Sequence, residues 1–172
     1  MLQQINETDF PEIYRIMQAS FPDDEYRPHE EQLALLKEPE YRIYYVPAGF
    51  LAVWEFETFT YIEHFAVDPA LRNSGTGTAM LQELLSSSQY TQKKKLICLE
   101  VELPEDELTK RRIGFYERNG FVFNEYPYMQ PPISKGKSSV PLRIMTYGTA
   151  IPEETFEKMK QVLYRRVYKV EV

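Results

Sequence analysis

The chain is poor in cysteine and in basic residues, and each shortage excludes a class of protein. Among the 172 residues Cys98 is the only cysteine, so no internal disulfide can form and a reducing cytoplasm is the expected location. Lys and Arg number 20 against 26 Asp and Glu, which gives a net charge of −6. This acidic balance argues against a protein that binds nucleic acid by neutralising its phosphates.

Long apolar runs and flexible linkers are also missing. No run approaches the roughly 18 apolar residues of a membrane span, and the start MLQQINETDF has neither the basic nor the apolar region of a signal peptide. No Gly/Ser-rich or Pro-rich segment divides the chain. The sequence therefore predicts one soluble domain over residues 1–172, with no membrane or nucleic-acid partner and no metal.

The sequence pattern of the first part of the chain changes from helical to strand-like. Thr8 or Asp9 is expected to cap a helix whose apolar residues recur at helical spacing, and the acidic segment PDDEYRPHE separates it from a second helix. The expected elements are a strand at 2–6, helices that end near Phe21 and before Pro39, and three antiparallel strands between 41 and 67.

The remaining pattern alternates helix and strand. It predicts a helix through 80–85, a strand at 96–103, a helix at 106–120, strands at 121–129 and 140–148, and a closing helix at 152–167. Strand, helix and strand in succession predict a parallel pair across a right-handed crossover. The expected fold class is α+β, a mixed, mostly antiparallel sheet of seven strands flanked by helices. The closing helix packs either on this sheet or on a second copy in a homodimer.

Two of the seven glycines lie close together in the stretch VDPALRNSGTGTAM, residues 67–80. A strand, a loop with Gly75 and Gly77, and then a helix is an arrangement that can bind an anion through free backbone N–H groups. A dinucleotide fingerprint would need a glycine at Met80, and a Walker loop would need a lysine after Gly77. Both nucleotide motifs are excluded, which leaves another phosphate ligand or a plain turn.

Two motifs in this order resemble the GNAT superfamily of acetyl-CoA-dependent N-acetyltransferases. The first is Arg72-x-x-Gly75-x-Gly77, directly after a strand. The second is Phe115-Tyr116-Glu117-Arg118-Asn119-Gly120-Phe121, a tyrosine on a late helix followed by Gly-Phe at the next strand. The resemblance implies a GNAT-like fold with a splayed parallel pair, and acetyl-CoA as co-substrate.

The resemblance also implies where acetyl-CoA binds. The loop amides would hold the diphosphate with added charge from Arg72, while the pantetheine arm pairs like a strand with the chain before the loop. Thr109 stands where many members carry an asparagine that contacts pantetheine. The implied cofactor-binding residues are Phe65, Ala66, Val67, Arg72, Asn73, Ser74, Gly75, Thr76, Gly77, Thr78 and Thr109.

The catalytic roles implied by the family fall on three residues. The Val67 N–H would stabilise the oxyanion of the tetrahedral intermediate. Tyr116 would protonate the CoA thiolate, because a phenol is protonated at neutral pH. Glu63 is the first candidate for the base, in a partly apolar setting expected to raise its pKa.

Other polar strand residues offer alternatives for the base. Glu102, near the end of its strand, is the second candidate. Glu100 is expected to face solvent, and a regular strand would place His64 on the side opposite to Glu63. An acidic rim formed by Asp23, Asp24 and Glu25 would favour a cationic acceptor.

The predicted function is transfer of an acetyl group from acetyl-CoA to a primary amine of a small molecule or peptide, by direct attack in a ternary complex. One alternative is a non-catalytic regulatory domain that binds acyl-CoA. A second alternative is a scaffold in which the glycine loop is only a turn.

Overall fold

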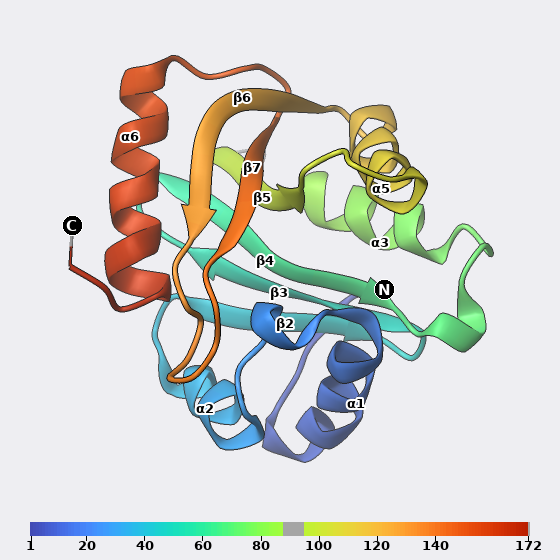
Figure 1. Cartoon of the computed structure of the whole chain (residues 1–172). Helices are drawn as coiled ribbons and strands as arrows, with labels where there is room; N and C mark the ends of the chain where they lie inside the picture. The colour runs from blue at the N-terminus through green and yellow to red at the C-terminus, as the bar shows by residue number, and fades with distance from the viewer. Residues whose placement is uncertain (88–94, 172) are drawn as a thin grey trace. The chain divides into compact units, whose positions relative to one another are not determined.

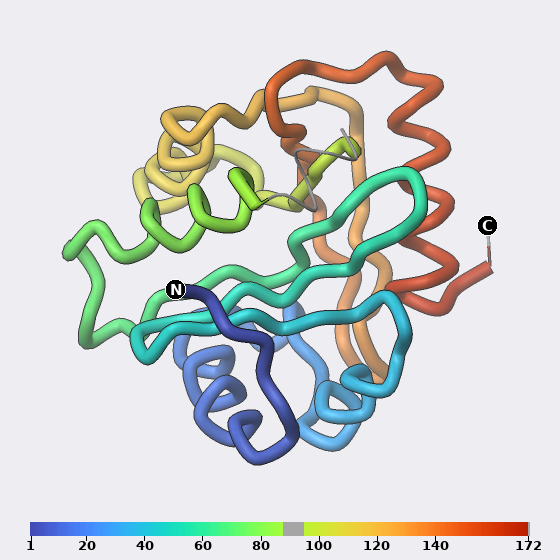
Figure 2. Tube along the Cα trace, turned by 180° about the vertical axis from the view of Figure 1, so that it is seen from behind, coloured from blue at the N-terminus to red at the C-terminus, as the bar shows by residue number. Residues whose placement is uncertain are grey.

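A computed structural model describes residues 1–87 and 95–171. The chain divides into two compact units, Met1–Ile97 and Cys98–Val172, and each unit is described by itself. Figures 1 and 2 follow the chain from the N-terminus, in blue, to the C-terminus, in red. The expectation of a single domain stays a prediction.

The first unit contains an antiparallel meander, as predicted. Its strands are β1 (Gln3–Gln4), β2 (Tyr41–Val46), β3 (Gly49–Glu55) and β4 (Phe59–Val67). β2 pairs with β1 and β3, and β3 pairs with β4. These segments are rich in β-branched and aromatic residues, which fit the pleated surface of a sheet, and every residue of β3 except Glu55 is buried.

Helices and short turns accompany this meander. They are η1 (Glu7–Asp9), α1 (Phe10–Ser20), η2 (Asp23–Glu25), α2 (His29–Ala34), η3 (Leu35–Lys37), η4 (Pro69–Leu71) and α3 (Thr76–Leu85). Asp9 occupies the N-cap position of α1, one of the two predicted positions, but makes no side-chain cap bond there. Its carboxylate instead accepts from the Asn6 N–H, in a capping box with Asn6 at the η1 turn.

The core of the first unit lies between α1 and the strands. Phe10, Ile13, Ile16 and Met17, the predicted apolar positions of α1, are all buried, and Trp54 of β3 is fully buried. Figure 1 shows α1 and α2 together beside β2–β4. Burial of a helical stripe against a sheet is the packing that this spacing predicts.

β4 is interrupted by a bulge. Ile62 pairs with Val53 and His64 pairs with Ala52, so Glu63 is an extra residue with no partner across the ladder. A bulge bends its strand and breaks the alternation of side chains. Glu63 and His64 therefore do not follow the alternation of a regular strand.

The second unit is built on three antiparallel strands. Its elements are β5 (Leu96–Glu102, which starts at the end of the first unit), α5 (Glu107–Arg118), β6 (Phe121–Gln130), β7 (Val140–Tyr147), α6 (Glu153–Val162) and the π-helix η5 (Leu163–Val167). β7 pairs with both β5 and β6. Gly120 follows α5 with φ 96°, as predicted for a helix end.

The closing helix packs on the strands of its own unit. The Phe156 ring of α6 stacks on Tyr126 of β6, with ring centroids 4.9 Å apart, and Met159 and Leu163 are also buried. Figure 1 shows α6 alongside β6 and β7. Of the two predicted packings, the one on its own sheet is observed. Within residues 1–87 and 95–171, no helix has the length and apolar character to cross a bilayer.

Candidate functional site

The glycine loop ends in an exposed helix N-terminus. Gly75 precedes α3 with φ 80°, and a Cβ there would meet no atom within 4 Å. Glycine is thus required at this position for its left-handed backbone and not for space. The amides of Thr76, Gly77 and Thr78 lie in the first turn of α3, where backbone N–H groups have no intrahelical acceptor. The loop presents several N–H groups that can bind an anion.

Val67 ends β4 with its peptide groups turned away from β3. The Asp68 N–H donates to the Ala48 carbonyl at 2.7 Å, and Val67 stands opposite Gly49 in the ladder. Bonded and non-bonded pairs alternate along an antiparallel ladder, so the Val67 N–H and C=O point to the other edge of β4. The Val67 N–H is therefore positioned to bind a group that is not part of β3.

Gly49 allows the two strands to approach closely at this point. A Cβ on Gly49 would lie 2.4 Å from the Ala66 carbonyl oxygen and 3.1 Å from the Val67 Cα. Only glycine fits without moving the end of β4. No pattern in the sequence marks this role, because a glycine directly after Pro47-Ala48 is also typical of a plain turn.

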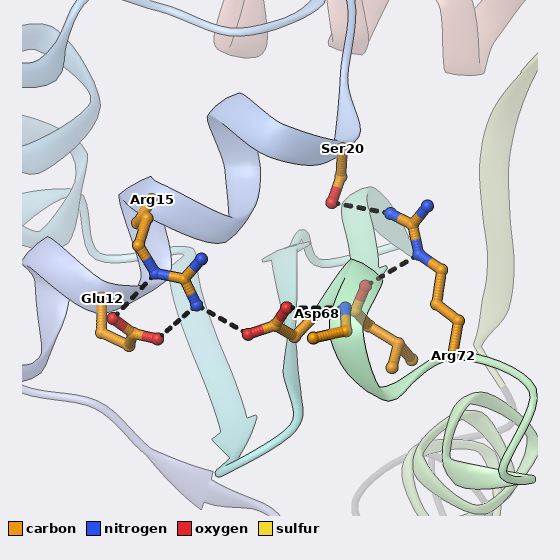
Figure 3. A network of polar contacts seen from close by, with 7 residues as sticks. Glu12, Arg15, Ser20, Asp68 and Arg72 are labelled. Atoms are coloured by element: carbon orange, nitrogen blue, oxygen red, sulfur yellow. Dashed lines mark hydrogen bonds and ion pairs between the residues drawn. The ribbon is translucent and has the colours of Figure 1, made fainter.

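Arg72 contacts the end of β4 and the end of α1. Its Nε donates to the Val67 carbonyl at 3.1 Å, and its Nη2 donates to the Ser20 Oγ at 3.0 Å. Figure 3 shows the guanidinium group between these two acceptors. The predicted anion-binding arginine is thus already bonded within the protein.

A second arginine makes a parallel link from α1. Arg15 pairs with Glu12 on its own helix and with Asp68, both at 2.6 Å. Asp68 also accepts from the Ala70 N–H at 3.0 Å. The hydrogen bond from Ala70 and the Arg15 guanidinium lower the pKa of Asp68. The carboxylate therefore stays ionised where it caps the η4 turn.

Glu63, the predicted base, lies in a buried ion pair. Its carboxylate is 2.9 Å from the Arg27 Nη1 and accepts from the Trp54 Nε1 at 2.7 Å, and only 2% of its side chain is exposed. Burial by itself would raise the pKa of Glu63, but the Arg27 charge and the hydrogen bonds lower it overall. The expectation of a raised pKa is wrong because the setting holds a cation.

His64 lies on the same side as Glu63, which corrects the prediction. Its Nε2 bonds the Glu25 carbonyl at 2.7 Å, and its ring meets Phe21 edge-on with centroids 4.8 Å apart. Glu25 and Arg27 belong to one segment between α1 and α2, so the bulge turns both side chains toward it. Burial lowers the pKa of His64, which keeps the imidazole neutral near pH 7.

Tyr116 and Thr109 lie on α5 in the second unit. The Tyr116 ring packs edge-on against Phe115 and Phe121, and burial raises its pKa to about 12. Its hydroxyl is therefore protonated at neutral pH, as an acid requires. The Thr109 hydroxyl donates to the Asp106 carbonyl at 3.0 Å within the capping box of α5.

The two carboxylates of β5 are both bonded within the second unit. Glu102 pairs with Arg112 at 3.2 Å. Glu100 accepts a short hydrogen bond from the Tyr128 hydroxyl and one of 2.6 Å from the Tyr168 hydroxyl. The prediction that Glu100 faces solvent is wrong, because two tyrosines from distant parts of the sequence bond to it.

Comparisons with known proteins identify the family of the chain. A family model described as "Acetyltransferase (GNAT) domain" matches residues 39–123. A solved structure titled "Putative acetyltransferase from GNAT family from Bacteroides thetaiotaomicron" is 34% identical, covers 99% of both chains and superposes with a TM-score of 0.89. The chain belongs to the GNAT family of acetyltransferases. The predicted fold class, α+β with a mixed and mostly antiparallel seven-stranded sheet flanked by helices, is confirmed.

One further relative agrees with this assignment, and a more distant solved structure shares the fold alone. "Putative acetyltransferase YjbC" of Bacillus subtilis is 28% identical over 155 residues, which are 86% of this chain and 77% of that protein. An aminoglycoside 6'-N-acetyltransferase complexed with coenzyme A is 14% identical, with a TM-score of 0.65 over 88% of this chain and 99% of that one, and shares the fold.

In this GNAT-family acetyltransferase, the structure brings some predicted site residues together. Val67, Arg72 and the glycine loop are joined in the first unit, and Tyr116 and Thr109 share a helix in the second. Sequence analysis missed Arg27, whose partner Glu63 lies on another element. No local motif marks such a pair, since an arginine that follows acidic residues in a sequence is commonly exposed to solvent.

Proposed function

We propose that the chain is an N-acetyltransferase that moves an acetyl group from acetyl-CoA to a primary amine of a small molecule or peptide. The observation that carries the proposal is the Val67 N–H, which turns away from β3 immediately before a loop of free amides at the start of α3. Family membership supports acetyl-CoA as the donor. The alternative remains a non-catalytic domain that binds acyl-CoA for regulation.

In the proposed complex the glycine loop binds the CoA diphosphate. The amides of residues 73–78 and the N-terminal end of α3 attract negative charge. The pantetheine arm lies along Phe65, Ala66 and Val67 and pairs with the peptide groups of Phe65 and Val67, which face the edge of β4 away from β3, whereas those of Ala66 face Phe50. Thr109 already uses its hydroxyl in the α5 cap, so any contact with pantetheine would come from its other atoms.

The reaction proceeds by direct attack in the ternary complex. The neutral amine nitrogen forms a bond to the thioester carbonyl carbon, and the Val67 N–H stabilises the resulting oxyanion. The C–S bond then breaks, and the thiolate takes a proton from the Tyr116 hydroxyl, which is protonated at neutral pH. The excess proton on the nitrogen passes to a base, and proton exchange through solvent restores the base and the Tyr116 phenol, which leaves the amide product and free CoA.

Glu63 and Glu102 are the carboxylates proposed for this base. The Arg27 ion pair makes Glu63 a weaker base than the sequence suggested, because a lowered pKa reduces its affinity for a proton. Glu102 pairs with Arg112 and is 32% exposed. Substitution of each by glutamine ranks them, since loss of the base lowers kcat most at low pH.

A free-thiol assay tests the proposal. Wild-type protein is incubated with acetyl-CoA and a panel of polyamines, amino acids, aminoglycosides and peptide N-termini, and binding of acetyl-CoA is measured separately by calorimetry. We expect binding, thiol release with at least one amine, and a loss of about 10²-fold or more in kcat for Tyr116→Phe with little change in affinity.

The matched control is Tyr147→Phe, which removes a hydroxyl from a partly exposed tyrosine of the same unit. Normal turnover by Tyr116→Phe would contradict its role as the acid. Acetyl-CoA binding without thiol release from any amine would favour the regulatory alternative. Absence of binding at millimolar acetyl-CoA would overturn both functions.

A further inference from the structure

We propose that Arg72 is a positioning residue that holds the Val67 carbonyl and so orients the end of β4, instead of serving chiefly as a ligand for the diphosphate. The inference rests on the proposed acetyl transfer, in which the Val67 N–H binds the oxyanion. It assigns to the arginine of the glycine-loop motif a role through the protein backbone.

The hydrogen bonds of Arg72 support this role directly. Nε bonds the carbonyl of Val67, and Nη2 bonds the hydroxyl of Ser20, the last residue of α1. A planar guanidinium presents its donors in a fixed fork. One side chain therefore fixes the distance between the end of α1 and the end of β4 (Figure 3).

Val67 benefits from such a partner because β3 and the adjoining Ala48 hold each of the two peptide groups that flank it at one end only. The Asp68 N–H is bonded to Ala48, and by the alternation of the ladder Ala66 is bonded to Phe50. The carbonyl of Val67 lies between these two fixed points and faces the other way. The Val67 N–H shares its peptide group with the Ala66 carbonyl, and the Val67 carbonyl shares its peptide group with the Asp68 N–H. The hydrogen bond from Arg72 holds the second of these groups at its other end and so restrains rotation about the Val67 Cα, which joins the two groups.

The neighbouring arginine link makes the restraint two-sided. Arg15 on α1 pairs with Asp68, which directly follows Val67 and caps the η4 turn. The peptide between Val67 and Asp68 is therefore tied to α1 on both of its sides. Exposed hydrogen bonds of this kind add little to global stability, so loss of the restraint should affect catalysis more than folding.

A comparison of two acetyl donors separates positioning from phosphate binding. Arg72→Gln, Arg72→Lys and Ser20→Ala are assayed with acetyl-CoA and with acetyl-pantetheine, which lacks the diphosphate. We expect Arg72→Gln to lower kcat about tenfold with both donors, Ser20→Ala to lower it less, and Arg72→Lys to recover part of the loss. An Arg72→Gln effect confined to the KM for acetyl-CoA would overturn the proposal.

The control is Arg42→Gln, which removes an arginine that also donates to a strand carbonyl, that of Tyr41, at 2.8 Å. We expect this variant to leave kcat unchanged with both acetyl donors. A readout independent of activity is hydrogen exchange of the ligand-free protein. The Asp68 amide should exchange faster in Arg72→Gln and Ser20→Ala than in wild type and Arg42→Gln.

Unchanged exchange of Asp68 in Arg72→Gln would overturn the positioning role whatever the activity. Failure of the wild type to release thiol, by contrast, would overturn the proposed function. The hydrogen-exchange result would still show whether Arg72 restrains the end of β4. The two failures are therefore distinguishable.

Discussion

Glu63 in the first unit and Glu100 in the second are both carboxylates taken up by partners inside the protein, but the partners differ in kind. Glu63 faces a cation, Arg27, with a hydrogen bond from the Trp54 indole. Glu100 accepts from two neutral hydroxyls, those of Tyr128 and Tyr168. At Glu63 a cation compensates the negative charge, whereas at Glu100 the dipoles of two hydroxyl groups stabilise it.

The difference determines how each site responds to acid and to alkali. In the first site burial by itself would raise the pKa of Glu63, but the Arg27 charge together with His64 and the hydrogen bonds lowers it overall, so the pair persists in mild acid. In the second, burial and then the Glu100 charge raise the pKa of Tyr128 well above its ordinary value. The tyrosine site is therefore sensitive to alkali, which would force a second negative charge beside the first.

The largest expected effect comes from breaking the ion pair. Arg27→Met leaves the Glu63 carboxylate buried without its cation. Removal of one partner of a buried ion pair lowers the free energy of unfolding by about 3–5 kcal/mol. Urea unfolding measures the loss. The double variant Arg27→Met/Glu63→Met should recover most of it, because no uncompensated charge remains. A loss below about 1 kcal/mol in the single variant would show that the pair is not desolvated as its burial indicates.

A smaller effect is expected when Glu100 loses one hydroxyl. Tyr168→Phe should destabilise the protein by about 1.5–3 kcal/mol, the range for a hydrogen bond to a charged group. The control is Tyr164→Phe, whose hydroxyl donates to the neutral carbonyl of Met129 at 2.5 Å and should cost only about 0.5–1.5 kcal/mol. Equal losses in urea unfolding would remove the distinction between the charged and the neutral acceptor.

The smallest effect is a dependence on alkaline pH. Because the folded pKa of Tyr128 exceeds that of an unfolded tyrosine, its contribution is complete below about pH 10 and declines above it by up to about 1.4 kcal/mol per pH unit. The stability of wild type should therefore fall more steeply between pH 9 and 11 than that of Tyr128→Phe, as measured by urea unfolding at each pH. Tyr45→Phe, at a half-buried position of the first unit, serves as the control, and parallel curves for wild type and Tyr128→Phe would refute the expectation.

Local patterns were sufficient to predict the elements. Apolar spacing predicted α1 and α6, and Gly120 marked the end of α5. Two short motifs predicted the family, because Gly75 and its neighbours must form a particular backbone before a helix. Each of these features depends on residues close together in the sequence, where propensity and spacing act directly.

Partners from distant segments were not predictable in the same way. Arg27 reaches Glu63 from another element, and Tyr128 and Tyr168 reach Glu100 from β6 and from the residue after η5. The sequence shows each of these side chains but not which others lie near it. The predicted pKa of Glu63 was wrong for this reason, whereas the protonated state of Tyr116 was anticipated because a phenol is protonated at neutral pH without any partner.

The bulge in β4 has a consequence for the chain as a whole. One additional residue shifts the phase of the alternation, so that every position from His64 to Val67 faces opposite to its place in an uninterrupted strand. Deletion of Glu63 would join Ile62 to His64 in a regular ladder and leave Phe65 and Val67 on their present faces, opposite Leu51 and Gly49. A strand that kept Glu63 in regular pairing would instead exchange the faces of Phe65 and Val67 and rotate the peptide edge that leads into the glycine loop, so the bulge is what sets that edge.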